Sequence, residues 1–134
     1  MRTIPELEQI FARDRFIAPF DVRITDLTET SVTIVAPVSD SLLNGNDVVQ
    51  GGALYTLSDY TFSVHANAIH CPSVTASGSI NYIHPARGDY LKAIATLKGQ
   101  TRRTFVYSVE VFDDRDVLVA LAEFSGAKLD VRTD

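Results

Sequence analysis

The most constraining feature of this sequence is one helical stretch that follows a pair of glycines. Residues 44–68 begin as a polar turn, pass through Gly51 and Gly52, and continue with helical periodicity. Apolar side chains recur there at spacings of three and four, which places them on one helix face. These residues are Leu54, Leu57, Thr61, Val64 and Ala68. We therefore predict a long helix over residues 50–70, ended by Pro72.

The neighbouring face of this helix consists of small or polar residues around one carboxylate. Its members are Gly52, Thr56, Asp59, Ser63 and Ala66. A helix with an apolar face and a small-residue face is expected to be packed on both sides. An ionised Asp within such a helix is costly to bury without partners. Asp59 is therefore the first candidate for a functional residue.

Most of the remaining chain alternates with the period of a β-strand. The alternation predicts a hairpin over residues 20–38 and strands over 74–84, 90–97, 104–112 and 117–129. Near the N-terminus, Thr3, Pro5 and Glu6 have the pattern of a capping box, which predicts a short helix over residues 3–15. One helix fills the inner face of an antiparallel sheet only if the sheet curls around it. The predicted fold class is α+β, with a curved antiparallel sheet wrapped around one central helix in a single domain of residues 1–134.

Composition limits the classes of function and partner. Twelve Lys and Arg against seventeen Asp and Glu give a net charge of −5, which argues against a nucleic-acid partner. A single cysteine, Cys71, favours a reducing compartment, and neither a signal peptide nor a membrane-spanning segment is apparent. We expect a cytoplasmic protein with no membrane partner. His65, His70 and Cys71 lack the spacing of a metal site, so no metal or cofactor is expected.

The order of elements and the residues at the helix entrance resemble the hotdog fold. More narrowly, residues 20–129 resemble the phenylacetate-degradation type of acyl-CoA thioesterase. That family has an Asn-Gly in the loop, a His-Gly-Gly at the helix start and an acid two turns later. Asn44-Gly45 and Asp59 match this pattern, whereas Gln50 precedes the glycine pair in place of His. Residues 85–89 resemble the family's Pro-x-x-Gly-Asp turn, and residues 100–103 resemble the basic turn that holds coenzyme A in related enzymes.

The resemblance implies hydrolysis of an aryl- or medium-chain acyl-CoA to a carboxylic acid and free coenzyme A. Asp59 would act as general base or nucleophile, and the Gly51 backbone N–H with the Asn44 side chain would polarise the carbonyl. Ser77 would orient the water. A helix N-terminus suits this chemistry, because its N–H groups are unpaired and a glycine there lets a carbonyl approach closely.

The resemblance also suggests residues that bind the substrate and a shared site. Gln50 and Gly52 belong to the helix entrance, and Arg87, Arg102 and Arg103 are candidates for the phosphates of coenzyme A. In this family Gly51 and Asn44 would come from one chain, and Asp59 with Ser77 from its partner. The resemblance therefore implies a homodimer, or a homotetramer made of two dimers.

The residue patterns leave alternatives open. Asp59 also suits a structural helix position, the glycine pair a tight turn, and the arginines a solvated turn. Gln50 cannot change its protonation as His does, so the alternative function is a non-catalytic acyl-CoA- or acyl-carrier-binding module. A hydratase is less favoured, because no His-containing motif is apparent. Three helix aromatics either line an acyl pocket or pack in the core, and these are Tyr55, Tyr60 and Phe62.

Overall fold

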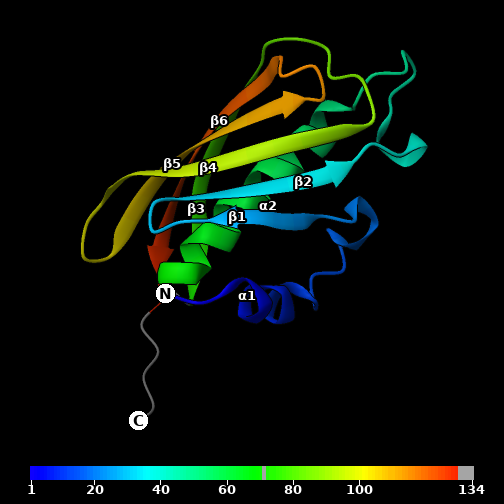
Figure 1. Cartoon of the computed structure of the whole chain (residues 1–134). Helices are drawn as coiled ribbons and strands as arrows, with labels where there is room; N and C mark the ends of the chain where they lie inside the picture. The colour runs from blue at the N-terminus through cyan, green and yellow to red at the C-terminus, as the bar shows by residue number, and fades with distance from the viewer. Residues whose placement is uncertain (71, 130–134) are drawn as a thin grey trace.

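The computed structural model describes residues 1–70 and 72–129, so Cys71 and residues 130–134 lie outside the described residues. Helix α2 runs over Gly51–Ile69 through the middle of the molecule (Figure 1). All the residues predicted for its apolar face are buried. The buried hydroxyls of Ser58 and Thr61 donate to carbonyl oxygens one turn earlier, at 2.8 and 2.7 Å, which pairs them within the helix.

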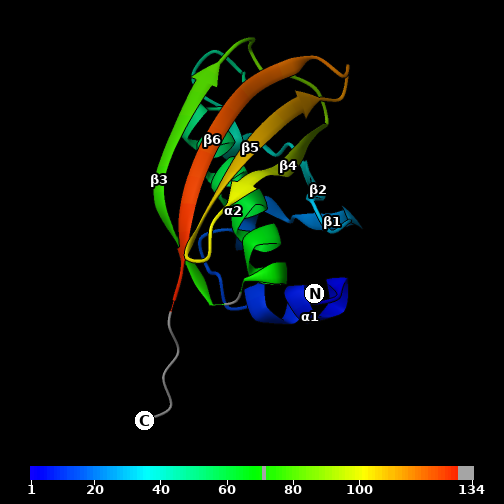
Figure 2. The ribbon, with the colours of Figure 1, turned by 90° about the vertical axis from the view of Figure 1, so that its left-hand side faces the viewer.

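One six-stranded sheet curves around α2, as the two views show (Figures 1 and 2). Its strands are β1 (Arg23–Leu27), β2 (Ser31–Pro37), β3 (Ser73–Tyr82), β4 (Tyr90–Gln100), β5 (Thr104–Asp113) and β6 (Leu118–Lys128). They lie in the order β1-β2-β4-β5-β6-β3, and every neighbouring pair is antiparallel. The predicted curved antiparallel sheet around one central helix is therefore confirmed.

The core lies between α2 and the concave face of the sheet. Alternate residues of β4 and β5 are buried, as the pleat of a strand requires. Phe62 of α2 stacks on Phe124 at 5.3 Å between ring centroids and meets Tyr107 edge-on at 5.2 Å. Tyr60 is buried against Phe11, and Phe62 is fully enclosed. Tyr60 and Phe62 therefore belong to the core, while Tyr55 is partly buried and meets Phe124 edge-on at 5.5 Å between ring centroids.

Helix α1 (Ile4–Phe11) packs below α2 and is shorter than predicted. Its N-terminus has the predicted capping box, with Thr3 and Glu6 bonded reciprocally. The prediction that it continues to residue 15 is wrong. The Asp14 carboxylate accepts the backbone N–H groups of Phe16 and Ile17 at 3.1 and 3.2 Å, which offers the chain a local alternative to further helix. A short 3-10 turn, Ala18–Phe20, then leads to β1.

Strand β3 is one edge of the sheet (Figure 2), and most of its residues are exposed. Its residues 74–79 are exposed on both faces, unlike those of β4 and β5. A long exposed edge strand is a ready template for pairing with another chain.

In the described part of the chain, no helix is long and apolar enough to cross a membrane.

Candidate active site

Asp59 lies two turns into α2 and is half-buried between the helix and β3. The Thr75 hydroxyl of β3 donates to Asp59 Oδ1 at 3.0 Å. Burial raises the pKa of Asp59 above its ordinary value, the Thr75 hydrogen bond partly offsets this rise, and the nearby Asp14 carboxylate adds to it. A carboxylate of this kind holds its proton more tightly than a free one and suits a general base.

Thr75, rather than Ser77, is the β3 residue that contacts Asp59 in this chain. A β-bulge between Thr75 and Ser77 interrupts the pairing of β3 with β6. Thr75 pairs with the buried Gly126, whereas Ser77 pairs with Ser125 and bonds its hydroxyl at 2.6 Å. Because opposite residues in a ladder share a face, the bulge turns Thr75 toward the helix and Ser77 away from it. Sequence reasoning missed Thr75, since only its pairing reveals which side it faces.

The entrance of α2 presents unpaired backbone donors. Gln50 is the N-cap residue, and its side-chain Oε1 accepts the N–H of Ala53 at 3.2 Å. Within the described residues, the N–H groups of Gly51 and Gly52 have no hydrogen-bond acceptor, as expected for the first helix positions. These N–H groups sit at the positive end of the helix dipole. The entrance can therefore stabilise a developing negative charge on a carbonyl oxygen.

Tyr82, at the end of β3, covers Gly51. Its hydroxyl donates to the Gly51 carbonyl oxygen at 3.0 Å. A Cβ added at Gly51 would lie 3.1 Å from the Tyr82 ring, so the ring packs closely against the glycine backbone. No sequence pattern indicates this contact, because it joins residues 31 positions apart in the chain. Gly51 is thus a position of close approach rather than only a flexible turn.

Asn44 stabilises the loop that leads to this entrance. Its side-chain Oδ1 accepts the backbone N–H groups of Asn46 and Val48 at 2.8 and 3.3 Å. The oxygen is therefore used within the loop, in the manner of an Asx turn. Its amide NH₂ is the part of the side chain that remains for a carbonyl.

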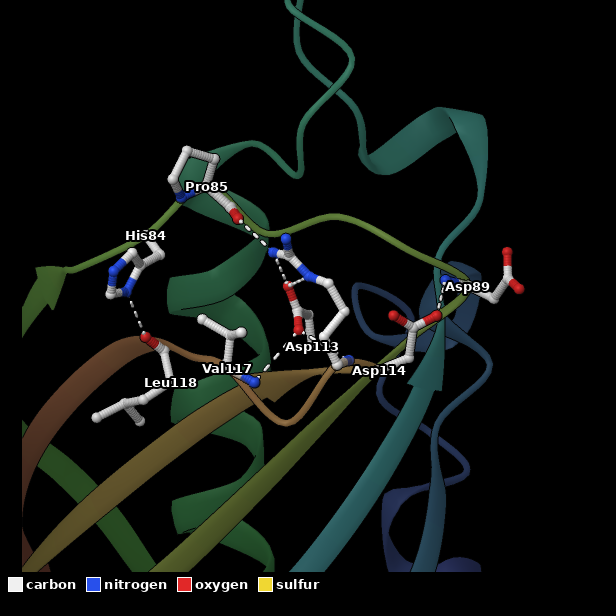
Figure 3. Close-up of polar contacts among 8 residues, drawn as sticks. His84, Pro85, Asp89, Asp113, Asp114, Val117 and Leu118 are labelled. Carbon is white, nitrogen blue, oxygen red and sulfur yellow. Dashed lines mark hydrogen bonds and ion pairs between the residues drawn. The ribbon is translucent and has the colours of Figure 1, made fainter.

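A polar network connects the β5–β6 turn to the loop before β4 (Figure 3). Asp113, only 1% exposed, accepts the Arg115 guanidinium and the backbone N–H groups of Arg115 and Val117. Burial opposes ionisation, but these hydrogen bonds hold the pKa of Asp113 below its ordinary value. Arg115 also donates to the Pro85 carbonyl at 3.5 Å, and Asp114 accepts the Asp89 N–H at 2.7 Å. The network fixes the loop that carries Arg87.

That loop in turn supports the entrance of α2. The carbonyl of the buried Ala86 accepts the N–H of Val49 at 3.1 Å, immediately before Gln50. His84 donates Nδ1–H to the Leu118 carbonyl at 3.1 Å, which assigns the proton to that nitrogen. The entrance is therefore anchored to the sheet through the 84–89 loop.

The candidate arginines fall in two places. Arg102 and Arg103 lie in the β4–β5 turn and line a cavity of about 330 Å³ with Lys128 and His70, at the C-terminal end of α2. Arg87 is exposed in the loop before β4, whereas the other two lie beyond the end of that strand. The structure thus brings Arg102 and Arg103 together but not Arg87.

One chain does not bring the candidate base to the candidate oxyanion donors. Gly51 and Asp59 lie about 12 Å apart along the helix axis, at about 1.5 Å per residue. Asn44, Gln50 and Gly51 gather at the entrance, while Asp59 and Thr75 lie further along α2. Within one chain the two groups are therefore separate.

The comparison with protein families decides the class of this chain. A family model described as the thioesterase superfamily matches residues 46–120, which is more than half of the chain. The chain belongs to the thioesterase superfamily. It is accordingly a thioester hydrolase, and the matched segment contains the helix entrance, Asp59 and Thr75.

Individual relatives agree with this family. The chain is 26% identical to the acyl-coenzyme A thioesterase PaaI of Escherichia coli (strain K12) over 113 residues, which cover 84% of this chain and 81% of the relative. The solved structure of the E. coli PaaI protein from the phenylacetic acid degradation operon superposes with a TM-score of 0.86 at 22% identity, covering 96% of this chain and 97% of that one. A hypothetical thioesterase protein from Streptococcus pneumoniae TIGR4, solved with coenzyme A, gives 0.85 at 25% identity, covering 94% and 99%. The predicted hotdog fold and the resemblance to the phenylacetate-degradation type are confirmed, while the roles of the site residues stay predictions.

Proposed function

We propose that the protein hydrolyses acyl-CoA thioesters to a carboxylic acid and free coenzyme A. The observation that carries the proposal is Asp59, a half-buried carboxylate with a raised pKa that accepts a hydrogen bond from Thr75. The E. coli relative named as an acyl-coenzyme A thioesterase supports coenzyme A as the carrier. A thioester on an acyl-carrier protein is the alternative substrate, and we propose an aryl- or medium-chain acyl group.

In the proposed reaction, Asp59 removes a proton from a water whose oxygen bonds to the thioester carbonyl carbon. Thr75 donates to Oδ1 and takes the positioning role for which Ser77 was the sequence candidate, which leaves Oδ2 for the water. The Gly51 N–H and the Asn44 amide donate to the oxyanion. The C–S bond then breaks, coenzyme A leaves as a thiolate, and the thiolate takes up a proton. Direct attack by Asp59 to give an anhydride is the second form of this chemistry.

The proposed site is completed by a second copy of the chain. Asp59 and Thr75 of one chain would face Gly51 and Asn44 of its partner, because the two halves are too far apart within one chain. The small and polar face of α2 and the exposed edge strand β3 support such a dimer. We extend the proposal to a tetramer of two dimers. We also propose a cytoplasmic location, because a single cysteine favours a reducing compartment.

The remaining candidates are assigned to substrate binding. Arg102 and Arg103 would bind the phosphates of coenzyme A, with Lys128 beside them, since guanidinium groups match phosphate oxygens in charge and geometry. Arg87 would contact the nucleotide from its separate loop. Gln50 has its oxygen bonded to Ala53, so its amide NH₂ would donate to the substrate, and Gly52 leaves space beside it.

Thiol release from a panel of acyl-CoA thioesters tests the proposal directly. Asp59→Asn should lower kcat/KM by about a hundredfold or more, as expected for the loss of an acid–base group. Asp26→Asn, which alters an exposed acid on β1, is the control and should leave turnover unchanged. Full activity in Asp59→Asn would refute the role of Asp59 as general base or nucleophile. Saturable acyl-CoA binding without turnover by the wild type would instead favour the binding module that Gln50 suggests.

A further inference from the structure

Tyr82 places a hydrogen-bond donor on the first peptide group of α2. Its hydroxyl donates to the Gly51 carbonyl oxygen at 3.0 Å. In the regular ladder of α2 the same oxygen accepts the N–H of Tyr55, four residues further on. A carbonyl oxygen has two lone pairs and accommodates both donors. The Tyr82 bond is therefore additional to what the helix itself requires.

The sheet and the glycine backbone together fix this bond in place. Tyr82 pairs with Ala120 in the β3–β6 ladder, and the N–H of the next residue, Ile83, donates to the Val119 carbonyl at 2.8 Å. The Tyr82 ring packs on Gly51, where an added Cβ would lie 3.1 Å from it. The hydroxyl thus has a defined position, although the side chain is 54% exposed.

The Gly51 carbonyl and the Gly52 N–H belong to one planar peptide group. A donor on the oxygen draws electron density from the nitrogen, which makes the N–H of the same group a stronger donor. Hydrogen bonds linked in this way strengthen one another by about 10–30% per bond. Within the described residues the Gly52 N–H has no acceptor, so this gain is available to a bound substrate.

Tyr82 also restrains a segment of backbone that has unusual freedom. Two successive glycines can adopt many conformations, and the first turn of a helix lacks the full ladder of the interior. The Gln50 side chain bonds Ala53 in this turn, and Tyr82 bonds Gly51. Donors that are oriented before the reaction need no reorganisation when charge develops.

We infer that Tyr82 is a positioning residue for the proposed hydrolysis, and that the Gly52 N–H is a second backbone donor to the oxyanion beside that of Gly51. The inference rests on the proposed function. Tyr82 acts through the Gly51–Gly52 peptide group, which it orients and polarises. Both partners of the Tyr82 bond lie in one chain, so this role does not depend on how a second copy docks.

Tyr82→Phe is the first test, because it removes the hydroxyl and keeps the ring on Gly51. It should lower kcat by about three- to tenfold, a fraction of the loss caused by removing a whole oxyanion donor. KM should stay within about twofold, since the oxyanion exists only after attack on the carbonyl. Tyr90→Phe removes the hydroxyl of an exposed tyrosine on β4 and is the control, which should change neither constant. An unchanged kcat in Tyr82→Phe overturns the inference and leaves the proposed hydrolysis intact.

Difluorotyrosine at position 82 separates polarisation from packing. The ring fluorines make the phenol more acidic, and so a stronger donor, with little change in size. While this phenol is protonated, kcat should exceed that of the wild type. Where it ionises, kcat should fall, because a phenolate cannot donate, and this adds a basic limb to the pH profile. The same replacement at Tyr90 should add no limb, and a profile at position 82 that matches the wild type overturns the inference.

The amide nitrogen chemical shift of Gly52 tests the bond without any activity. A donor on the preceding carbonyl deshields this nitrogen, so Tyr82→Phe should move its resonance upfield. Gly99, which lies in β4, should not move. An unmoved Gly52 resonance in the folded variant overturns the inference, whatever the turnover.

The outcomes distinguish the inference from the proposed function. A lower kcat together with an upfield Gly52 resonance upholds the inference. Wild-type turnover that Tyr82→Phe leaves unchanged refutes the inference alone. A wild type that hydrolyses no thioester refutes the proposed function, and the inference falls with it even if the Gly52 resonance moves.

Discussion

At the scale of single residues, Asp59 is the point on which the proposed chemistry depends. Burial and the Asp14 carboxylate raise its pKa, while the Thr75 hydroxyl lowers it. Thr75 is exposed and supports no core packing, so its removal should act on the ionisation of Asp59 rather than on the fold. Thr75 and Ser77 therefore offer a matched pair of hydroxyls, one that bonds the carboxylate and one that does not.

We predict that Thr75→Val moves the acidic limb of the kcat/KM profile to higher pH. The substitution removes the hydrogen bond that favours the carboxylate, so the pKa of Asp59 rises further. A base works only when deprotonated, and activity is then lost at a higher pH on acidification. The measurement is thiol release as a function of pH, with Ser77→Ala as control. A shift in Ser77→Ala and none in Thr75→Val would return the positioning role to Ser77.

At the scale of elements, the N-terminus of α2 is the feature to test. Gly51 occupies the first helical position after the Gln50 cap, where proline is well accommodated because its missing N–H has no intrahelical partner. Gln50 has φ −65° and ψ 139°, which is the conformation that a following proline prefers. Gly51→Pro therefore deletes one backbone donor with little cost to the helix.

We predict that Gly51→Pro lowers kcat by about a hundredfold or more, as removal of an oxyanion donor does elsewhere. Gly51→Ala is the control, because it adds the same Cβ against the Tyr82 ring but keeps the N–H. It should lose much less activity. Steady-state turnover of both variants, with melting temperatures to verify folding, makes the comparison. Equal losses in the two variants would assign the effect to crowding with Tyr82 instead.

Elements were more predictable from the sequence than the contacts between them. Periods of about 3.6 and 2 residues reveal helices and strands, so α2, the strand order along the chain and the placement of Asp59 on α2 were readable. The bulge that turns Thr75 inward leaves no such period, and neither does the packing of Tyr82 on Gly51. The unpredicted part of the site thus arises from pairing between distant segments.

At the scale of the whole molecule, the proposal requires two chains for each site. A dimer built from one Asp59→Asn chain and one Gly51→Pro chain would contain one site with both defects and one site with neither. Random pairing of equal amounts makes half of the dimers mixed, so the mixture should recover about a quarter of wild-type activity from two inactive proteins. The variants are unfolded and refolded together, and thiol release is compared before and after. Mixing Asp59→Asn with the Asp59→Asn/Gly51→Pro double variant is the control, because no pairing of these chains contains an intact Asp59. No recovery in the first mixture, with each variant folded and dimeric, would place the complete site within one chain.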